Sequence, residues 1–194
     1  MSPRSKEQFE EIREASLRKI FDASLELFGT KGYDSTSIAA IARHAGISKG
    51  LIYNYFDSKE DLLEAMIMDL MKLGDQILEK SMQKDTAKTL EGIIRSIFQW
   101  LRDNEKLNRL LVGLSLHLDR FDFIRQLSHQ KMNGYLKMLE NMLQELGFED
   151  HKTEARILST VFDGIAMHYL VLKEDYPMAE IEEMLINKYC KHSK

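Results

Sequence analysis

The sequence predicts an all-α fold of about nine helices, in which a small N-terminal helix-turn-helix head of three helices precedes a larger C-terminal helical domain. The chain of 194 residues contains only two prolines and ten glycines, so few positions interrupt a helix. Apolar residues recur three and four positions apart along most of the chain, as they do on one face of a helix. No segment shows the alternation of apolar and polar residues that is typical of a half-buried strand.

The long helices can be placed from their apolar spacing and their boundaries. The first covers residues 7–29, and Thr30-Lys31-Gly32-Tyr33 ends it. Another should run from residue 58 to about Lys84, because Ser58-Lys59-Glu60-Asp61 has the S/T-x-x-D/E pattern of a capped helix start. The remaining helices are expected at residues 86–103, 105–119, 121–146, 152–174 and 178–191.

Residues 36–59 predict two short helices joined by a sharp turn. Gly46 provides the positive φ angle with which a chain leaves one helix and enters another. Ser48 is placed to cap the second helix with its hydroxyl, and this helix should extend to about Phe56. The expected inward positions are Ile38, Ile41, Ala42, Leu51, Ile52 and Phe56. This pattern is a helix-turn-helix, whose second helix lies in the major groove of DNA.

The outward side chains of this motif are of the types that bind DNA, and the second helix has no acidic residue on that face. Lys49, Gly50 and Asn54 should face base edges, where lysine favours guanine and asparagine favours adenine, and Gly50 permits close backbone approach. Phosphates should be contacted through hydroxyls, an ammonium and helix N-terminal amides. The residues assigned to phosphates are Thr36, Ser37, Tyr53, Tyr55 and Lys59, and Ser48 completes the DNA-binding set. Two helices joined by a glycine turn also occur in all-α proteins that do not bind DNA.

Residues 20–63 resemble the DNA-binding head of the TetR/AcrR family of bacterial transcription regulators. The resemblance has no gaps and covers roughly a third of the chain, whereas the remainder shares only helical character and length with the family. It implies a DNA-binding domain over residues 1–57 and an effector-binding and dimerisation domain over residues 58–194. The matching residues are Ala23, Phe28, Gly32-Tyr33, Thr36-Ser37, Ile41-Ala42, Ala45 to Gly50, Tyr53, Tyr55-Phe56 and Ser58 to Leu62.

The charge distribution fits a DNA-binding head on an acidic protein. The whole chain has a net charge of −4, but residues 31–59 contain four basic and two acidic residues, a net charge of +2. No apolar run approaches the roughly 18 residues of a membrane span, and the N-terminal segment lacks the apolar core of a secretory signal. Cys190 is the only cysteine, so no internal disulfide forms. We therefore expect a cytoplasmic protein.

Residues 154–174 are apolar around much of the helix circumference, which requires two sets of neighbours. The two sets would be the core of the same chain and a partner chain, although the central helix of a monomer explains the pattern too. The family resemblance favours a homodimer, and dimerisation supplies the two-fold symmetry that a palindromic DNA site requires. The residues assigned to the dimer interface are Leu158, Phe162, Ile165 and Tyr169.

The C-terminal domain is rich in methionine and aromatic residues, which can line a pocket for an apolar ligand. Residue by residue, the filling of a helical core is the favoured interpretation. The family resemblance implies that some effector binds in this domain, and we expect its pocket among residues 86–170. The candidate effector-binding residues are Phe98, Leu111, Leu114, His117, Phe121, Tyr135, Met138, Met142, Phe162 and His168.

The expected function is sequence-specific regulation of transcription. We expect a repressor that a small, largely apolar effector releases from a palindromic operator in double-stranded DNA. The six histidines show no metal-ligand spacing, and there is no phosphate-binding glycine loop or nucleophile elbow, so we expect no enzyme activity, metal or cofactor. A transcriptional activator, an architectural DNA-binding protein without an effector and a helical adaptor that has lost DNA binding are the alternatives.

Overall fold

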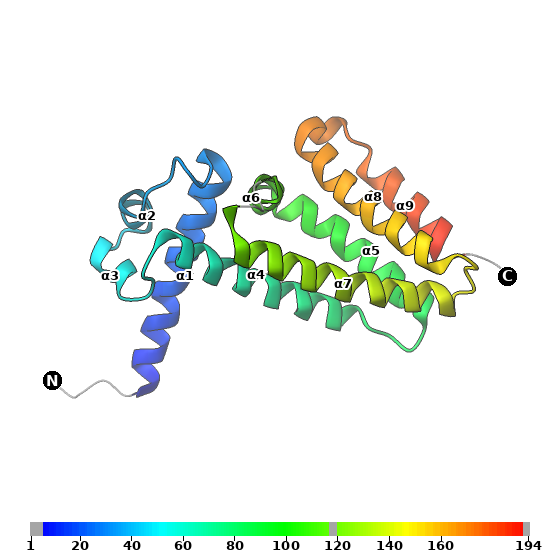
Figure 1. Cartoon of the computed structure of the whole chain (residues 1–194), viewed down its shortest axis with the longest axis horizontal. Coiled ribbons are helices and arrows are strands. Elements are labelled where there is room, and N and C mark those ends of the chain that lie inside the picture. The colour runs from blue at the N-terminus through cyan, green and yellow to red at the C-terminus, as the bar shows by residue number, and fades with distance from the viewer. Residues whose placement is uncertain (1–5, 117–119, 192–194) are drawn as a thin grey trace. The chain divides into compact units, whose positions relative to one another are not determined.

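The computed structural model describes residues 6–116 and 120–191, which form helices and loops without a strand (Figure 1). A 3₁₀ turn, Lys173–Asp175, follows α8. The predicted all-α fold with nine α-helices is confirmed for the described residues. The helices are α1 (Lys6–Lys31), α2 (Ile38–Ala45), α3 (Lys49–Tyr53), α4 (Lys59–Ser81), α5 (Thr86–Asp103), α6 (Glu105–Ser115), α7 (Asp122–Glu145), α8 (His151–Leu172) and α9 (Met178–Tyr189).

The chain divides into two compact units, residues 1–70 and 71–194, and the division falls within α4. In the first unit, which we call the head, α1 packs against α2 and α2 packs against α3. Its fully buried side chains include Ile20, Ile41 and Ile52, which hold the three helices together. The functional boundary predicted after residue 57 lies just before α4 and stays a prediction.

The second unit, which we call the C-terminal domain, is a helical bundle. The main packed pairs are α7 with α8, α5 with α9 and α6 with α8. Leu90, Ile94 and Phe98 lie four residues apart on α5 and are fully buried, so this helix presents one continuous apolar stripe to the core. The side-chain amide of Asn108 on α6 donates to the carbonyl of Ala166 on α8 at 2.9 Å, which gives this buried polar group a partner.

α3 and α4 each end three residues earlier than the sequence predicted. α3 ends at Tyr53 instead of Phe56, and the amides of Tyr55 and Phe56 both donate to the carbonyl of Ile52 at 3.0 Å in a turn that leaves the helix. α4 ends at Ser81 because the Thr89 hydroxyl accepts the amide of Gln83 at 2.8 Å and holds the reversal into α5. Part of the helix expected at residues 105–119 lies outside the described residues.

The helical segment His151–Asp175 is long and apolar enough, by length and composition, to cross a membrane. This corrects the expectation that no segment approaches a membrane span. The observation is weak evidence for a membrane, because an apolar helix in the core or interface of a protein meets the same criterion. Only 17% of its apolar window is buried within this chain, so much of its apolar surface has no partner among the described residues.

Cys190 directly follows α9 and packs against the core of the C-terminal domain. Burial raises the pKa of its thiol to about 11. Because the thiolate is the reactive form of cysteine, this side chain is chemically quiet at neutral pH.

Candidate nucleic-acid interface and ligand cavity

The turn between α2 and α3 has the geometry that its glycine predicts. Gly46 has a φ angle of 67°, in the left-handed region that favours glycine. The amide of Ile47 donates to the carbonyl of Ala42 at 3.0 Å, a bond that closes the C-terminus of a helix. The chain is thereby redirected from α2 into α3 within three residues, Gly46 to Ser48.

Serine side chains cap both helices of the motif. The Ser37 hydroxyl accepts the amide of Ala40 at 3.2 Å, and the Ser48 hydroxyl accepts the amide of Leu51 at 3.1 Å. These bonds satisfy amides that have no partner inside the helix. The predicted cap at Ser48 is therefore present, and both serines are exposed at the surface of the head.

The exposed face of α3 carries the residues that were assigned to DNA. Lys49, Gly50, Tyr53 and Asn54 are exposed, whereas Ile52 is fully buried. The ammonium of Lys49 lies 5.5 Å from the centroid of the Tyr53 ring, and α3 contains no acidic residue. Tyr55 is half-buried behind this face. The structure thus groups a basic, hydroxyl-bearing and amide-bearing surface on one side of the helix.

Gly50 is a glycine that the fold of this chain does not require. Its φ angle is not positive, and a Cβ atom built there would meet only the Ser48 hydroxyl, at 3.9 Å. Glycine inside a helix is less favourable than alanine by about 1 kcal/mol. The packing of the described residues therefore gives no reason for glycine at position 50.

Thr36 does not have the exposed hydroxyl expected for a phosphate contact. The residue is only 2% exposed, and its hydroxyl lies 2.9 Å from the carbonyl of Gly32 and 3.2 Å from that of Leu27. Its threonine side chain therefore holds the α1–α2 connection, which corrects the role expected for the hydroxyl. A motif match alone did not distinguish this internal bond from a DNA contact.

The ammonium of Lys59 is also engaged within the head. It donates to the carbonyls of Tyr33 at 2.8 Å and Thr36 at 2.9 Å, and it lies 4.1 Å from the centroid of the Tyr33 ring. The Tyr33 ring in turn lies 5.2 Å from the ring of Phe28 on α1. We call the contacts among Lys59, Tyr33 and Thr36 the Lys59 clamp. They join the start of α4 to the α1–α2 connection, and a phosphate contact by Lys59 would have to share an ammonium that is already bound.

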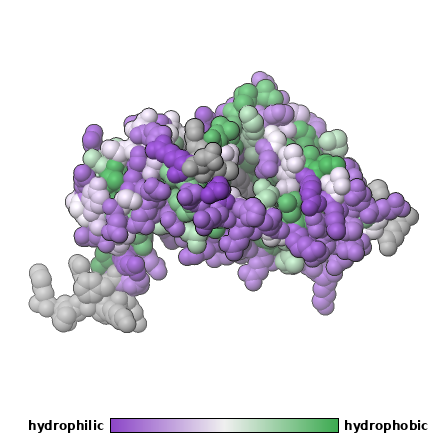
Figure 2. Space-filling model, viewed as in Figure 1, coloured by the Kyte–Doolittle hydropathy of each residue, from purple (hydrophilic) through white to green (hydrophobic). Residues whose placement is uncertain are grey.

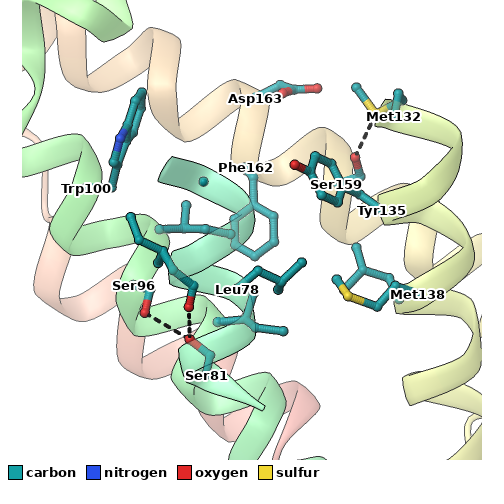
Figure 3. A pocket seen from close by; sticks show the side chains of 15 residues that line it. Leu78, Ser81, Ser96, Trp100, Met132, Tyr135, Met138, Ser159, Phe162 and Asp163 are labelled. Carbon is teal, nitrogen blue, oxygen red and sulfur yellow. Dashed lines mark hydrogen bonds between the residues drawn. The ribbon is translucent and has the colours of Figure 1, made fainter. Parts of the chain in front are cut away.

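The C-terminal domain contains a largely apolar cavity of about 320 Å³ (Figure 3). This volume is at the small end of the range of about 300–1,000 Å³ for ligand pockets. Polar groups are few: the Ser81 and Ser96 hydroxyls lie 3.4 Å apart, and Asp163 lies on α8 at the edge of the cavity. The lining residues that give it its apolar character include Leu78, Ile97, Trp100, Met132, Tyr135, Met138 and Phe162.

Three of the ten residues predicted for effector binding, Tyr135, Met138 and Phe162, line this cavity. The predicted pocket at residues 86–170 omitted α4, which contributes Ile77, Leu78 and Ser81. Apolar composition did not separate cavity-facing from core-facing positions, which differ only by a fraction of a helix turn. Four others are buried but do not line the cavity: Phe98, Leu114, Phe121 and Met142. Leu111 is half-buried outside the cavity, and His168 is exposed with its ring 5.8 Å from that of Tyr176. His117 lies outside the described residues.

Of the four residues assigned to the dimer interface, two are buried within this chain and two are half-buried, and the interface itself stays a prediction. Leu158 and Ile165 are buried in the core of this chain, and Phe162 points into the cavity (Figure 3). Tyr169 is half-buried and packs against the core. Because α8 is apolar on two faces, its composition alone does not show which face packs inside the chain. The exposed apolar residues of α8 are Ile157, Met167, Val171 and Leu172, and Met184 of α9 is exposed too. Figure 2 shows hydrophobic surface over the C-terminal end of α8.

A family model described as bacterial regulatory proteins, tetR family, matches residues 20–66, which span the helix-turn-helix and the start of α4. The chain is 31% identical over 129 residues to the fatty acid metabolism regulator protein of Bacillus subtilis, and the match covers 66% of each chain. It is 27% identical over 155 residues to the transcriptional regulator BetI of Escherichia coli K12, with 76% of this chain and 78% of BetI covered.

Solved structures share the fold over most of the chain. A TetR transcription regulator from Haloarcula marismortui has a TM-score of 0.78 at 20% identity, covering 92% of this chain and 97% of its own. FadR from Bacillus subtilis in complex with stearoyl-CoA has a TM-score of 0.74 at 21% identity, covering 91% and 99%. The head carries the matched motif with its turn and caps in place, and the C-terminal domain follows the same helical architecture. The chain accordingly belongs to the TetR family of bacterial transcription regulators.

Proposed function

We propose that this protein is a homodimeric repressor that binds a palindromic operator through its two heads and leaves DNA when a small, largely apolar molecule fills the cavity. The observation that carries the proposal is the course of α4. This single helix begins in the head at the Lys59 clamp and contributes Gly74, Ile77, Leu78 and Ser81 to the cavity wall. A ligand that changes the packing of the last turns of α4 therefore acts on the element that enters the head.

The α3 face supports the DNA-binding part of the proposal. Lys49 and Asn54 would contact base edges, and Tyr53, with Ser37 and Ser48 at the helix starts, would contact phosphates. Gly50 lies exposed in the middle of this surface and is not needed by the fold. An approaching DNA backbone or base edge gives a reason for glycine at that position. Tyr55 and Lys59 would act behind the surface by holding it in place.

The exposed apolar residues of α8 and α9 support the homodimer. Met167, Val171 and Met184 have relative exposures of 56%, 72% and 61%. Met167 and Val171 lie four residues apart on α8 and therefore share a face, and an exposed apolar patch marks a protein interface more often than a solvated face. A second copy of the chain that packs on this surface would present two recognition helices, with half-sites about 34 Å or a multiple apart.

The effector mechanism follows from linkage between two sites. A molecule releases the operator only if it binds the released conformation better than the DNA-bound one. A tenfold loss of operator affinity needs about 1.4 kcal/mol of coupling, which a bound ligand can supply. Relatives include a fatty acid metabolism regulator and a FadR structure with stearoyl-CoA, which favours an effector with a long apolar part.

Two linked measurements test the proposal with the full chain. Selection from random DNA should return a palindrome, and a clear absence of sequence preference would favour an architectural DNA-binding protein. Hydrophobic compounds should then be titrated against the protein–operator complex and against the free protein. Compounds that bind the cavity but leave operator affinity unchanged would rule out the switch. Transcription from a reporter decides between repression and activation, because the sign depends on where the operator lies relative to the promoter.

We place the protein in the cytoplasm.

A further inference from the structure

The charged residues that line the cavity of the C-terminal domain are of one sign only. Among the described residues that line it, Asp163 is the one carboxylate and none is basic. Figure 3 shows Asp163 on α8 next to Phe162, which projects into the cavity. The remaining lining residues are aliphatic, aromatic or small, apart from the hydroxyls of Ser81, Ser96, Ser159 and Tyr135. A charged group of a ligand at the α8 edge of this cavity therefore meets a negative charge.

Asp163 is unpaired in the part of the chain that the structure describes. It forms no hydrogen bond or ion pair there. The residue is exposed at the edge of the cavity, and partial desolvation raises the pKa of its carboxyl above the ordinary value. Asp75, on the neighbouring α4, shows the contrast. It accepts from the ammonium of Lys131 at 2.6 Å and from the hydroxyl of Tyr135 at 3.2 Å. One carboxylate is thus satisfied by the protein, and the other is available to a ligand.

The basic groups around the cavity are already paired with acidic residues. Lys131 is held by Asp75, and Arg102 lies 3.1 Å from the carboxylate of Glu182. Arg95 contacts both Glu91 at 2.9 Å and Glu182 at 3.5 Å. A carboxylate or phosphate that entered the cavity beside α8 would meet Asp163 as a like charge.

The walls also favour a cation. Trp100, Tyr135 and Phe162 present three aromatic side chains to the same cavity. Aromatic faces attract ammonium groups, most strongly where water is excluded. We infer that the effector is a lipophilic cation, an aliphatic or aromatic amine or ammonium compound whose charged group pairs with Asp163 while its apolar body fills the space beside Leu78 and Met138. This inference rests on the proposed effector function of the cavity and names the class of molecule that it binds.

The chain contains its own reporter for the test, because Trp100 is its only tryptophan and lines the cavity. Three probes of equal chain length should be titrated against the full-length protein while Trp100 fluorescence is followed: decylamine, decanol and decanoate. We expect decylamine to bind at least about tenfold more tightly than decanol, with decanoate weakest, because hydrogen bonds to charged groups are the strong ones. Equal or tighter binding of decanoate would overturn the inference.

Asp163→Asn removes the charge and keeps the size of the side chain. It should abolish the advantage of decylamine over decanol, a loss of about tenfold in affinity, while decanol binding stays unchanged. The matched control is Asp150→Asn, which removes one charge at the start of the same helix and preserves its cap, since asparagine caps as well as aspartate. The control should bind all three probes like the wild type. An unchanged decylamine affinity in Asp163→Asn would overturn the assignment of this carboxylate.

The operator complex separates this inference from the proposed function. If decylamine binds through Asp163 but leaves operator affinity unchanged, the ligand class stands and the effector switch fails. If decanoate or decanol releases the operator and decylamine does not, the switch stands and the cationic class fails. If none of the three probes perturbs Trp100 or the operator complex, the inference fails together with the effector role of the cavity.

Discussion

The helix-turn-helix region and the cavity differ in how their polar side chains are bonded. In the head, Thr36, Ser37, Ser48 and Lys59 all bond to backbone groups of the head itself. In the C-terminal domain, the cavity has mainly apolar walls, and Asp163 has no partner among the described residues. Recognition of base edges needs a surface held in one geometry, whereas an apolar ligand needs walls that can conform to it. From this difference we expect the helix-turn-helix region to keep one geometry and the cavity walls to adapt to a ligand.

The largest effect should come from preventing the homodimer from forming. Met167→Glu places a charge on the exposed apolar surface of α8 and should produce monomers in sedimentation at micromolar concentration. Operator affinity should fall by about a hundredfold or more, because two linked heads gain that much over one. Met82→Glu is the matched control: it changes an equally exposed methionine, 56% in both cases, outside α8. Dimers of the Met167 variant with normal operator binding would contradict the proposed interface.

The next largest effect should come from opening the Lys59 clamp. Lys59→Met removes a charge-assisted donor to two carbonyls, and we expect a loss of about 2 kcal/mol in the free energy of unfolding, measured with urea. Operator affinity should fall as the head loosens, but the slope of affinity against salt concentration should stay the same. A direct phosphate contact would instead lower that slope by about one. A reduced slope with unchanged stability would restore the phosphate contact first expected for Lys59.

A substitution at Gly50 should separate stability from DNA binding. Gly50→Ala should raise the free energy of unfolding by up to about 1 kcal/mol, because alanine is the better helix former. It should also lower operator affinity about tenfold if DNA approaches the backbone there. Gly134→Ala on α7 is the control, since a Cβ atom there also has open space around it and the site lies outside the head. It should give the stability gain alone. Unchanged operator binding in Gly50→Ala would remove Gly50 from the interface.

The smallest effect concerns a polar group that the head leaves unsatisfied. The Ser24 hydroxyl is fully buried and has no hydrogen-bond partner among the described residues. Ser24→Ala should therefore raise the free energy of unfolding by about 1 kcal/mol and leave operator affinity unchanged. Thermal and urea unfolding would both report the gain. A loss of stability would mean that the hydroxyl has a partner, such as a bound water.

The fold could be predicted from the sequence because its signals are local. Helical spacing marked each long helix, and Gly46 and Ser48 marked the turn and the cap, where one residue type suits one backbone geometry. α3 was predicted too long because the backbone bonds from Tyr55 and Phe56 to Ile52 form a turn that residue types do not specify. The boundaries of α4 depended on a contact with Thr89, eight residues beyond its end.

The site was predicted less completely because it depends on contacts between distant segments. Thr36 and Lys59 have residue types that suit phosphates. Only the folded head shows that the Thr36 hydroxyl donates to the carbonyl of Gly32 and that the Lys59 ammonium donates to the carbonyl of Thr36. The cavity combines α4, α5, α7 and α8, so Tyr135 could be chosen from composition, but Ile77 and Leu78 of α4 could not be joined to it. Composition also could not separate the face of α8 that packs inside the chain from the face that is exposed. Leu158 and Val171 are both apolar, and only tertiary packing makes one buried and the other exposed.

The quiet thiol of Cys190 makes the chain suitable for site-directed labelling. With a pKa of about 11, Cys190 offers little thiolate to a maleimide or methanethiosulfonate reagent at pH 7. A cysteine introduced at exposed His44 on α2 would therefore react selectively, without removal of the native residue. In a homodimer this label occurs twice, once on each head. Pulsed electron paramagnetic resonance between the two spin labels would then measure the separation of the heads directly, with and without a ligand in the cavity.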